Sequence, residues 1–422
     1  MHKIERLLQA LAPKGVEFKT LEEVFEIKNG YTPSKNNPEF WEKGTIPWFR
    51  MEDIRENGRI LKDSIQHITP KALKNKKLFP KNSIIISTTA TIGEHALLIV
   101  DSLANQRFTF LSKKANCNIA LDMKFFFYQC FLLGEWCKKN TNVSGFASVD
   151  MTAFKKYKFP IPPLEIQQEI VKILDAFTEL NTELNTELKA RKKQYQYYQN
   201  MLLDFKDTNQ NHKDAKIKTY PKRLKTLLQT LAPKGVEFRK LGEVINILKG
   251  KQLNKELLLD YGEYPVMNGG IHASGYWNEY NTDYPKIIIS QGGASAGYVN
   301  YMTSKFWAGA HCYTIELNSE KLNYKFLYYF LKNSQSILMK SQFGAGIPAL
   351  NKADIETLTI PIPPLEIQQE IVKILDQFSI LTTDLLAGIP AEIEARKKQY
   401  EYYREKLLSF KPLTPHKEVK KC

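Results

Sequence analysis

The stretch that decides the fold is Pro160-Ile-Pro-Pro-Leu-Glu-Ile-Gln-Gln-Glu-Ile-Val-Lys-Ile-Leu-Asp175. The same sixteen residues recur letter for letter from Pro361 to Asp376, 201 positions later in a chain of 422. A repeat of this length does not arise by chance, and its spacing is close to half of the chain. The sequence therefore contains an internal duplication.

Each copy of this stretch predicts the start of a long helix. Pro163 and Pro364 suit the first helical turn, and the glutamates behind them favour the positive end of the helix dipole. Apolar residues then recur every three or four positions, as in a helix packed lengthwise on a partner. Leu164 to Phe205 would span about 60 Å, and we expect the two long helices to pack on each other. The candidate packing residues are Leu180, Leu184, Leu188, Tyr195, Leu385 and Tyr400.

A shorter repeated segment precedes each domain. Leu7 to Phe18 returns as Leu227 to Phe238 with one substitution, and Pro13 and Gly15 end the short helix that it predicts. The repeat unit is thus a short helix, a domain and a long helix. The expected divisions are 1–18 (short helix), 19–160 (first domain), 161–206 (central long helix), 207–238 (linker and second short helix), 239–361 (second domain), 362–412 (distal long helix) and 413–422 (basic tail).

The two domains share a plan although their sequences diverge. Short apolar runs between Gly and Pro predict strands and loops; Ser83 to Ser87 is the clearest buried strand, matched by Lys286 to Ser290. Met123 to Lys138 predicts a helix. The expected fold class is α+β, with two similar mixed α/β domains separated by two long antiparallel coiled-coil helices in a pseudo-two-fold repeat. The long helices are nearly identical, which indicates that they do the same job, whereas the sequences of the two domains have diverged. We therefore expect the two domains to share one fold and to bind different ligands.

The two long helices differ in one region each. The first carries tandem Asn-Thr-Glu-Leu tetrads at 181–184 and 185–188, whereas the second contains Gly388-Ile389-Pro390. Because proline removes a helical hydrogen bond, we expect a kink at that point.

Composition gives a broad class of partner. The formal net charge is +15, which favours a polyanion such as nucleic acid, although a surplus that serves only solubility explains the charge equally well. No apolar run is long enough to cross a membrane, and the start of the chain lacks the features of a signal peptide. Five cysteines show neither metal-site spacing nor a disulfide pattern. We expect a reduced, cytoplasmic protein.

Two groups of loop residues leave alternatives open. Lys35 and Arg50 alternate with Trp41, Trp48 and Phe49, and such rings either stack against nucleic acid or belong to the core. The pairs Gly269-Gly270 and Gly292-Gly293 either cradle phosphates with backbone N–H groups or form tight turns with positive φ.

A basic run on each long helix also leaves two interpretations open. The run Arg191-Lys192-Lys193, repeated at Arg396-Lys397-Lys398, is either a solvated helix face or a contact with DNA or a partner.

A search for catalytic motifs finds none. The chain has no GxxxxGK[ST] phosphate loop, no HExxH, and no Asn/Asp-Pro-Pro-aromatic motif of amino-methyltransferases. Its histidines, His95, His272 and His311 among them, are isolated. We therefore expect no catalytic and no metal-binding residues.

With these features together, the chain resembles the specificity subunit of type I restriction-modification enzymes. The resemblance rests on the repeated Pro-x-Pro-Pro-Leu-x-x-Gln-x-x-Ile helix starts, each behind a variable domain. Thr32-Pro33-Ser34-Lys35, the run from Trp41 to Trp48, and the run from Tyr264 to Tyr276 are similar to the family's target-recognition domains. The Asn-Thr-Glu-Leu tetrads resemble short repeats at the same place in that family.

The resemblance implies a function without catalysis in this chain. Each domain would read one half of a bipartite, asymmetric sequence in double-stranded DNA, and the coiled coil would set the spacer and dock two methyltransferase subunits. Adenine methylation and ATP-dependent restriction, with S-adenosylmethionine, ATP and Mg, would belong to the modification and restriction/translocase subunits. The alternative is a non-enzymatic coiled-coil scaffold with protein-binding domains. The candidate DNA-contacting residues are Lys35, Arg50, Thr88, Thr89, Gln106 and Arg107, then Gly269, Gly270, His272, Gln291 and Tyr298.

Overall fold

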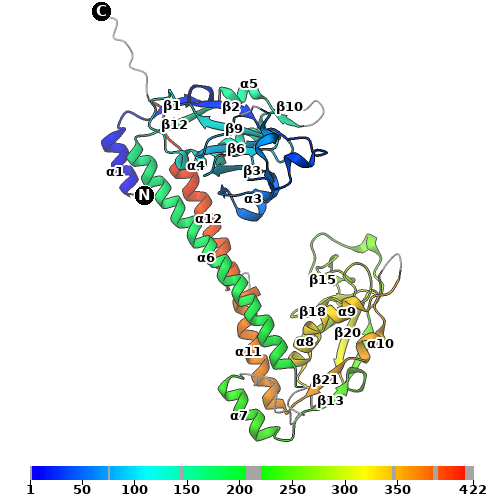
Figure 1. Ribbon diagram of the computed structural model, residues 1–422. Helices are drawn as coiled ribbons and strands as arrows, with labels where there is room; N and C mark the ends of the chain where they lie inside the picture. The colour runs from blue at the N-terminus through cyan, green and yellow to red at the C-terminus, as the bar shows by residue number, and fades with distance from the viewer. Residues whose placement is uncertain are drawn as a thin grey trace, which may run out of the picture. The chain divides into compact units, whose positions relative to one another are not determined.

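The computed structural model describes residues 2–74, 77–142, 147–205, 220–344, 348–383 and 388–413. The chain forms two compact units. One comprises residues 1–183 and 394–422, and the other comprises residues 184–393. Each unit contains one mixed α/β domain together with segments of the long helices (Figure 1).

The first domain is built on a five-stranded sheet with the order β2-β9-β6-β7-β4. All pairs are antiparallel except β4 with β7. All five residues of β6 are buried, which confirms the predicted strand. Helix α4 (Met123–Lys139) contacts β7 and β6 and extends one residue beyond its predicted end. The strands are β2 (Phe25–Asn29), β4 (Ile60–Leu61), β6 (Ser83–Ser87), β7 (His95–Leu98) and β9 (Phe108–Lys113).

A smaller sheet, β5-β3-β8, completes this domain. Its strands are β3 (Ile46–Phe49), β5 (His67–Ile68) and β8 (Leu103–Ala104), and β3 runs parallel to β8. Trp48 and Phe49 are buried in it, and Trp41 packs edge-on against Trp48, so the predicted rings belong to the core. The remaining elements are α2 (Leu21–Val24), α3 (Met51–Asn57), α5 (Met151–Lys155), η1 (Pro38–Phe40), η2 (Pro70–Leu73), β10 (Thr141–Asn142) and β11 (Ser148–Val149).

The second domain repeats this plan with the sheets β14-β20-β17-β18 and β16-β15-β19. Ile84 pairs with Leu111 in the first domain and Ile287 pairs with Ile315 in the second, so the central strands correspond. Among the described residues, the second main sheet has no counterpart of β4. The elements are β14 (Ile245–Lys249), β15 (Tyr264–Met267), β16 (Gly275–Trp277), β17 (Lys286–Ser290), β18 (Val299–Met302), β19 (Trp307–Ala308), β20 (Cys312–Leu317), α8 (Tyr324–Asn333), α9 (Gln335–Lys340), α10 (Lys352–Glu356), η4 (Leu241–Glu243) and η5 (Lys255–Leu257).

The long helices are antiparallel within each unit. In the first unit, Phe177 of α6 (Leu164–Leu203) stacks on Tyr403 of α12 (Ile389–Leu408) with ring centroids 5.6 Å apart. In the second, Tyr198 of α6 stacks at 5.1 Å on Phe378 of α11 (Leu365–Thr383). As the residue number on α6 rises from 177 to 198, the number of the contacted residue falls from 403 to 378. These contacts and the paired domains confirm the α+β fold and its internal repeat.

The predicted packing residues of the long helices lie on or near this interface. Leu184 is buried, Leu180 and Leu188 are half-buried, and Tyr195 and Tyr400 lie 6.3 Å from Phe378 and 6.1 Å from Phe177 respectively. Leu385 lies outside the described residues. Gly388 is a bend and α12 begins at Ile389, so Pro390 sits in the first turn of a separate helix rather than at a kink within one. Proline is compatible with that first turn because its missing N–H has no helical partner there.

Each short helix ends just before its proline, as the sequence predicts, but the expected segments 1–18 and 207–238 also contain the start of a strand. Helix α1 is His2–Leu11 and α7 is Lys222–Leu231. Residues 17–18 and 237–238 lie instead in β1 (Glu17–Thr20) and β13 (Glu237–Lys240), which pair with β12 (Lys158–Ile161) and β21 (Thr359–Ile362). The chain leaves the helix because Pro13 cannot continue it and Gly15, at φ 108°, turns it back. Ile161 and Ile362 likewise belong to strands and not to the long helices.

The repeated stretch fixes each domain to its long helix. Gln167 is fully buried; its Oε1 accepts from the Asp122 backbone N–H at 2.8 Å, and its Nε2 donates to the carbonyls of Ala120 and Pro162. About two turns further along α6, Asp175 accepts hydrogen bonds from Lys124 Nζ and from the Tyr128 hydroxyl, each at 2.6 Å. These side chains join the start of α4 to α6.

The second unit makes the same contacts. Gln368 accepts from the Asn323 N–H at 2.7 Å and donates to the carbonyls of Lys321 and Pro363. Asp376 accepts from Lys325 and Tyr329 of α8. Burial, and next the neighbouring carboxylate, raise the pKa of Tyr128 and of Tyr329, so both hydroxyls remain donors. The sixteen residues recur unchanged because they form the same joint twice.

Candidate nucleic-acid interface

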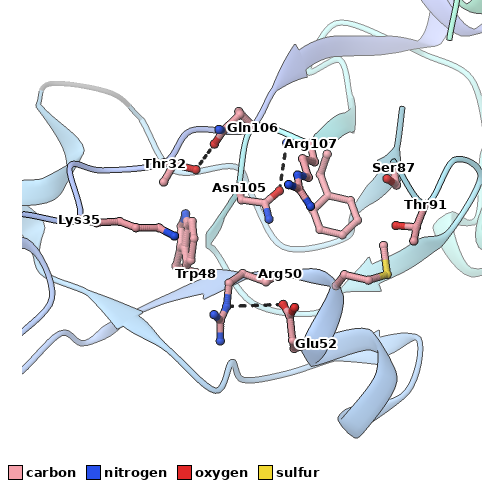
Figure 2. A pocket seen from close by; sticks show the side chains of 12 residues that line it. Thr32, Lys35, Trp48, Arg50, Glu52, Ser87, Thr91, Asn105, Gln106 and Arg107 are labelled. Atoms are coloured by element: carbon pink, nitrogen blue, oxygen red, sulfur yellow. Dashed lines mark hydrogen bonds and ion pairs between the residues drawn. The ribbon is translucent and has the colours of Figure 1, made fainter. Parts of the chain in front are cut away.

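Four of the predicted DNA-contacting residues converge on one pocket of the first domain. Lys35, Arg50, Gln106 and Arg107 line a cavity of about 240 Å³ at the ends of β3, β6 and β8 (Figure 2). Three of them are cations, and the fourth, Gln106, has an amide that can donate hydrogen bonds. The other lining residues are Thr32, Trp48, Met51, Glu52, Ser87, Thr91, Asn105 and Phe108. The pocket is therefore polar and mainly basic, with an aromatic wall.

Arg50 is positioned by the strand that precedes it. It follows β3 directly, its backbone N–H donates to Asp53 Oδ2 at 2.6 Å, and its guanidinium carbon lies 5.9 Å from the Trp48 ring centroid. Trp48 is itself fixed, because its indole N–H donates to the Tyr31 carbonyl at 2.8 Å. The Nε of Arg50 is buried and has no hydrogen-bond partner; the nearest carboxylate oxygen, Oε2 of Glu52, is 3.9 Å away. The guanidinium is thus held in place with donor capacity left over.

The loop after β8 presents Gln106 and Arg107. Both side chains are exposed, and the loop is closed locally, since the Arg107 N–H donates to Asn105 Oδ1 at 3.0 Å. Gln106 Oε1 accepts from the Thr32 hydroxyl, which ties this loop to the one that carries Lys35. In the view of Figure 2, Thr32 and Gln106 lie opposite Arg50 and Glu52.

Thr88 and Thr89 do not line this pocket. Thr88 is buried, its hydroxyl pairs with that of Thr109 at 3.0 Å, and its backbone binds Arg107 and Val149. Thr89 is half-buried and bridges to Ser148. Their neighbours Ser87 and Thr91 line the pocket instead. Ser87 and Thr88 are successive residues at the end of β6, so their side chains point to opposite faces, whereas Thr89 lies beyond the strand, where it bridges to Ser148.

The second domain has a different set of side chains at the same place. The carbonyl of Phe49 accepts from the Asn105 N–H, and the carbonyl of Met267 accepts from the Gly309 N–H, so these two strand ends are equivalent. The next residues, Arg50 and Asn268, therefore occupy equivalent positions. By the same comparison, Arg107 corresponds to His311. Asn268 Oδ1 accepts from the His311 N–H at 3.2 Å, so this loop is also closed by an asparagine. The scaffold is kept while the exposed chemistry changes.

The glycines of the second domain form turns. Gly269 has φ 84° and Gly293 φ 82°, a region that side chains rarely adopt, and a Cβ on Gly269 would lie 3.0 Å from the Gly292 carbonyl oxygen. These facts account for Gly269 and Gly293 as turn glycines. Gly270 packs against the backbone of His272, whose side chain is exposed.

Gln291 and Tyr298 lie on either side of the turn after β17. Gln291 is half-buried; its N–H donates to the His311 carbonyl and its own carbonyl accepts from Leu350, as Thr88 does in the first domain. The ring of Tyr298 has Lys332 Nζ 4.0 Å from its centroid, and burial lowers the pKa of Lys332 to about 8. Gln291 therefore adjoins His311, whose N–H in turn binds Asn268, whereas Tyr298 belongs to the contact with α8.

Sequence reasoning missed Glu52, Asn105, Asn268 and His311 as members of these sites. A short polar segment after a buried strand was the available signal, because loops at strand ends commonly carry binding residues. Among the residues that the structure describes, no group of three or more His, Cys, Asp or Glu side chains is placed to hold a metal. No described helix combines the length and apolarity needed to cross a bilayer.

Comparisons with known proteins match this architecture. The model of the type I restriction modification DNA specificity domain matches residues 13–194 and again residues 233–395. The chain belongs to this family. It is 41% identical over 399 residues to the Escherichia coli type I restriction enzyme EcoprrI specificity subunit. The aligned region covers 90% of this chain and 91% of that protein.

Solved structures show the same fold. The type I restriction-modification S subunit from M. genitalium matches with a TM-score of 0.58 at 19% identity and covers 93% of this chain and 96% of that chain. A second match is a chain from a structure that addresses complex assembly and conformational transition of the type I R-M system. Its TM-score is 0.60 at 20% identity, and the match covers 94% of this chain and 98% of that chain. The family match falls on both copies of the repeat, so both domains are specificity domains.

Proposed function

We propose that this chain is the DNA-recognition subunit of a type I restriction-modification complex. Each domain reads one half of a bipartite, asymmetric target in double-stranded DNA. The observation that carries the proposal is one fold with two different polar surfaces at the same strand ends, Arg50 and Arg107 in one domain and Asn268 and His311 in the other. Two half-sites of different sequence require such a pair of surfaces.

The long helices support the second part of the proposal, which concerns assembly. The coiled coil sets the spacer between half-sites and docks two methyltransferase subunits, one for each repeat. Adenine methylation and ATP-dependent restriction, with S-adenosylmethionine, ATP and Mg, belong to the partner subunits. The chain contributes binding and geometry alone.

Binding to DNA tests the proposal directly. Because the chain carries a formal charge of +15, we expect its affinity for duplex DNA to fall by ~10³–10⁵-fold between 50 and 200 mM salt. Methylation mapping with the assembled modification complex then gives the target. Lys35→Ala and His272→Ala are exposed substitutions that leave the core intact, and we expect each to weaken recognition of one half-site only.

Two outcomes would contradict the proposal. If affinity did not respond to salt, or if both substitutions weakened both half-sites equally, the domains would not be independent readers of DNA. A scaffold with protein-binding domains predicts that random-sequence and target duplexes bind equally weakly.

A further inference from the structure

Glu52 is a carboxylate in a basic pocket. It lies in the first turn of α3, directly after β3, and lines the same cavity as Lys35, Arg50 and Arg107. Its side chain is 52% exposed, and Figure 2 shows it beside Arg50 at the edge of the pocket. Duplex DNA carries a negative charge for every ~1.7 Å of its axis, so a carboxylate on a DNA-facing surface is repelled unless it makes a compensating contact.

The fold does not require this carboxylate. Asp53, the next residue, is fully buried and already serves the first turn of α3: Oδ2 accepts from the Arg50 N–H and Oδ1 from the Ile65 N–H, each at 2.6 Å. The Glu52–Arg50 pair is 3.9 Å long with both side chains partly exposed, a geometry that contributes little to stability. The helix dipole favours a carboxylate in this first turn, but the buried Asp53 already supplies one, so capping and ion pairing leave the second, exposed carboxylate unexplained.

The second domain differs at this position. In the first domain Arg50 is followed by helix α3, whereas the equivalent Asn268 is followed by bends at Gly269 and Gly270 and by no helix. The chain therefore presents a carboxylate at the end of this strand in one domain and backbone alone in the other. Such a difference after equivalent strands is expected of a residue that distinguishes one half-site from the other.

We infer that Glu52 reads a cytosine in the first half-site by accepting a hydrogen bond from its N4 amino group; this rests on the function proposed above. In the major groove, cytosine offers that amino donor, and a carboxylate is its matching acceptor. Adenine offers a donor next to the acceptor N7, which an amide matches and a carboxylate does not. The arginines beside Glu52 supply the donors that guanine and phosphates require.

Glu52→Gln tests the inference, because it keeps the shape and adds a donor. The full chain is assembled with its modification subunits, and the methylated targets are mapped for wild type and variant. We expect one position of the first half-site to lose its preference for cytosine by about 5- to 150-fold, with adenine gaining, while the second half-site stays unchanged. Glu56→Gln is the matched control: it makes the same charge change on an exposed residue of α3 outside the pocket.

The outcomes separate this inference from the function on which it rests. A wild-type complex without any sequence preference would overturn both. A variant that keeps the wild-type target, or that binds all sequences more tightly by a uniform factor, would overturn the role of Glu52 alone, because charge repulsion without base contact gives that result. Loss of discrimination in both half-sites would do the same.

Discussion

At the scale of single residues, the joint between domain and long helix depends on the amide of Gln167. The side chain is fully buried and makes three hydrogen bonds to backbone groups, at residues 120, 122 and 162. Each buried backbone group left without a partner costs about 1–3 kcal/mol. We expect Gln167→Ala to lower the free energy of unfolding by at least ~2 kcal/mol.

Its sequence neighbour provides the control. Gln168 is exposed, so Gln168→Ala should change the same free energy by less than ~0.5 kcal/mol. Urea unfolding of the two variants measures both values. Equal midpoints for the pair would show that the amide is not needed at the joint.

The same scale shows why the site was only partly predictable. Lys35, Arg50, Gln106 and Arg107 were foreseen because long polar side chains in loops are usually exposed, and the fold brings all four to one pocket. Thr88 sits in a segment that looks equally polar in the sequence, yet it is buried against Thr109 of β9. Which face a residue takes at a strand end depends on the register of the neighbouring strand, and that information is not local.

At the scale of elements, the tandem tetrads make the length of α6 testable. Leu180, Leu184 and Leu188 step by four and four, where a coiled-coil stripe steps by three and four. Four residues turn a helix by ~400°, so removing one tetrad rotates the remainder by only ~40° and keeps a leucine on the stripe. The same change shortens the helix by ~6 Å, against ~3.4 Å per base pair of DNA.

A helix inclined to the duplex projects less than its full ~6 Å onto the DNA axis, so deleting 185–188 should leave both half-sites unchanged and shorten the spacer between them by about one or two base pairs. Methylation mapping of the deletion variant supplies the measurement. Replacing the same four residues with Ala-Ala-Glu-Leu preserves the length and serves as the control. Full activity on an unshortened spacer would mean that α6 does not set the distance.

Elements were more predictable than their ends. Strand β6 and helices α4 and α6 follow from unbroken apolar runs and from period-three-to-four patterns, both of which are local signals. The entry of residues 17–18 into β1 was missed because that strand forms only by pairing with β12, some 140 positions away. Helix α3, which carries Glu52, is seven residues long and has too few apolar positions to show a period.

At the scale of the whole molecule, the repeat makes one helix contact twice. Phe177 packs against Tyr400 and Tyr403 in the first unit, and Phe378 packs against Tyr195 and Tyr198 in the second. By position in the duplicated sequence, Phe177 is equivalent to Phe378. Tyr195 is equivalent to Tyr400 and Tyr198 to Tyr403, each 205 residues later. Each half of the chain thus carries both surfaces of this contact.

A fragment that ends at Leu203 retains Phe177 and the Tyr195–Tyr198 pair but lacks the partners of both. Two copies can supply those partners to each other, so we expect a homodimer with two-fold symmetry that recognises an inverted repeat of the first half-site. Sedimentation velocity measures the association. Phe177→Ala in the fragment should give a monomer, whereas Tyr197→Ala, at a side chain that is 59% exposed, should leave the dimer intact. If the unmodified fragment stayed monomeric well above its DNA-binding concentration, the two halves would not be interchangeable partners.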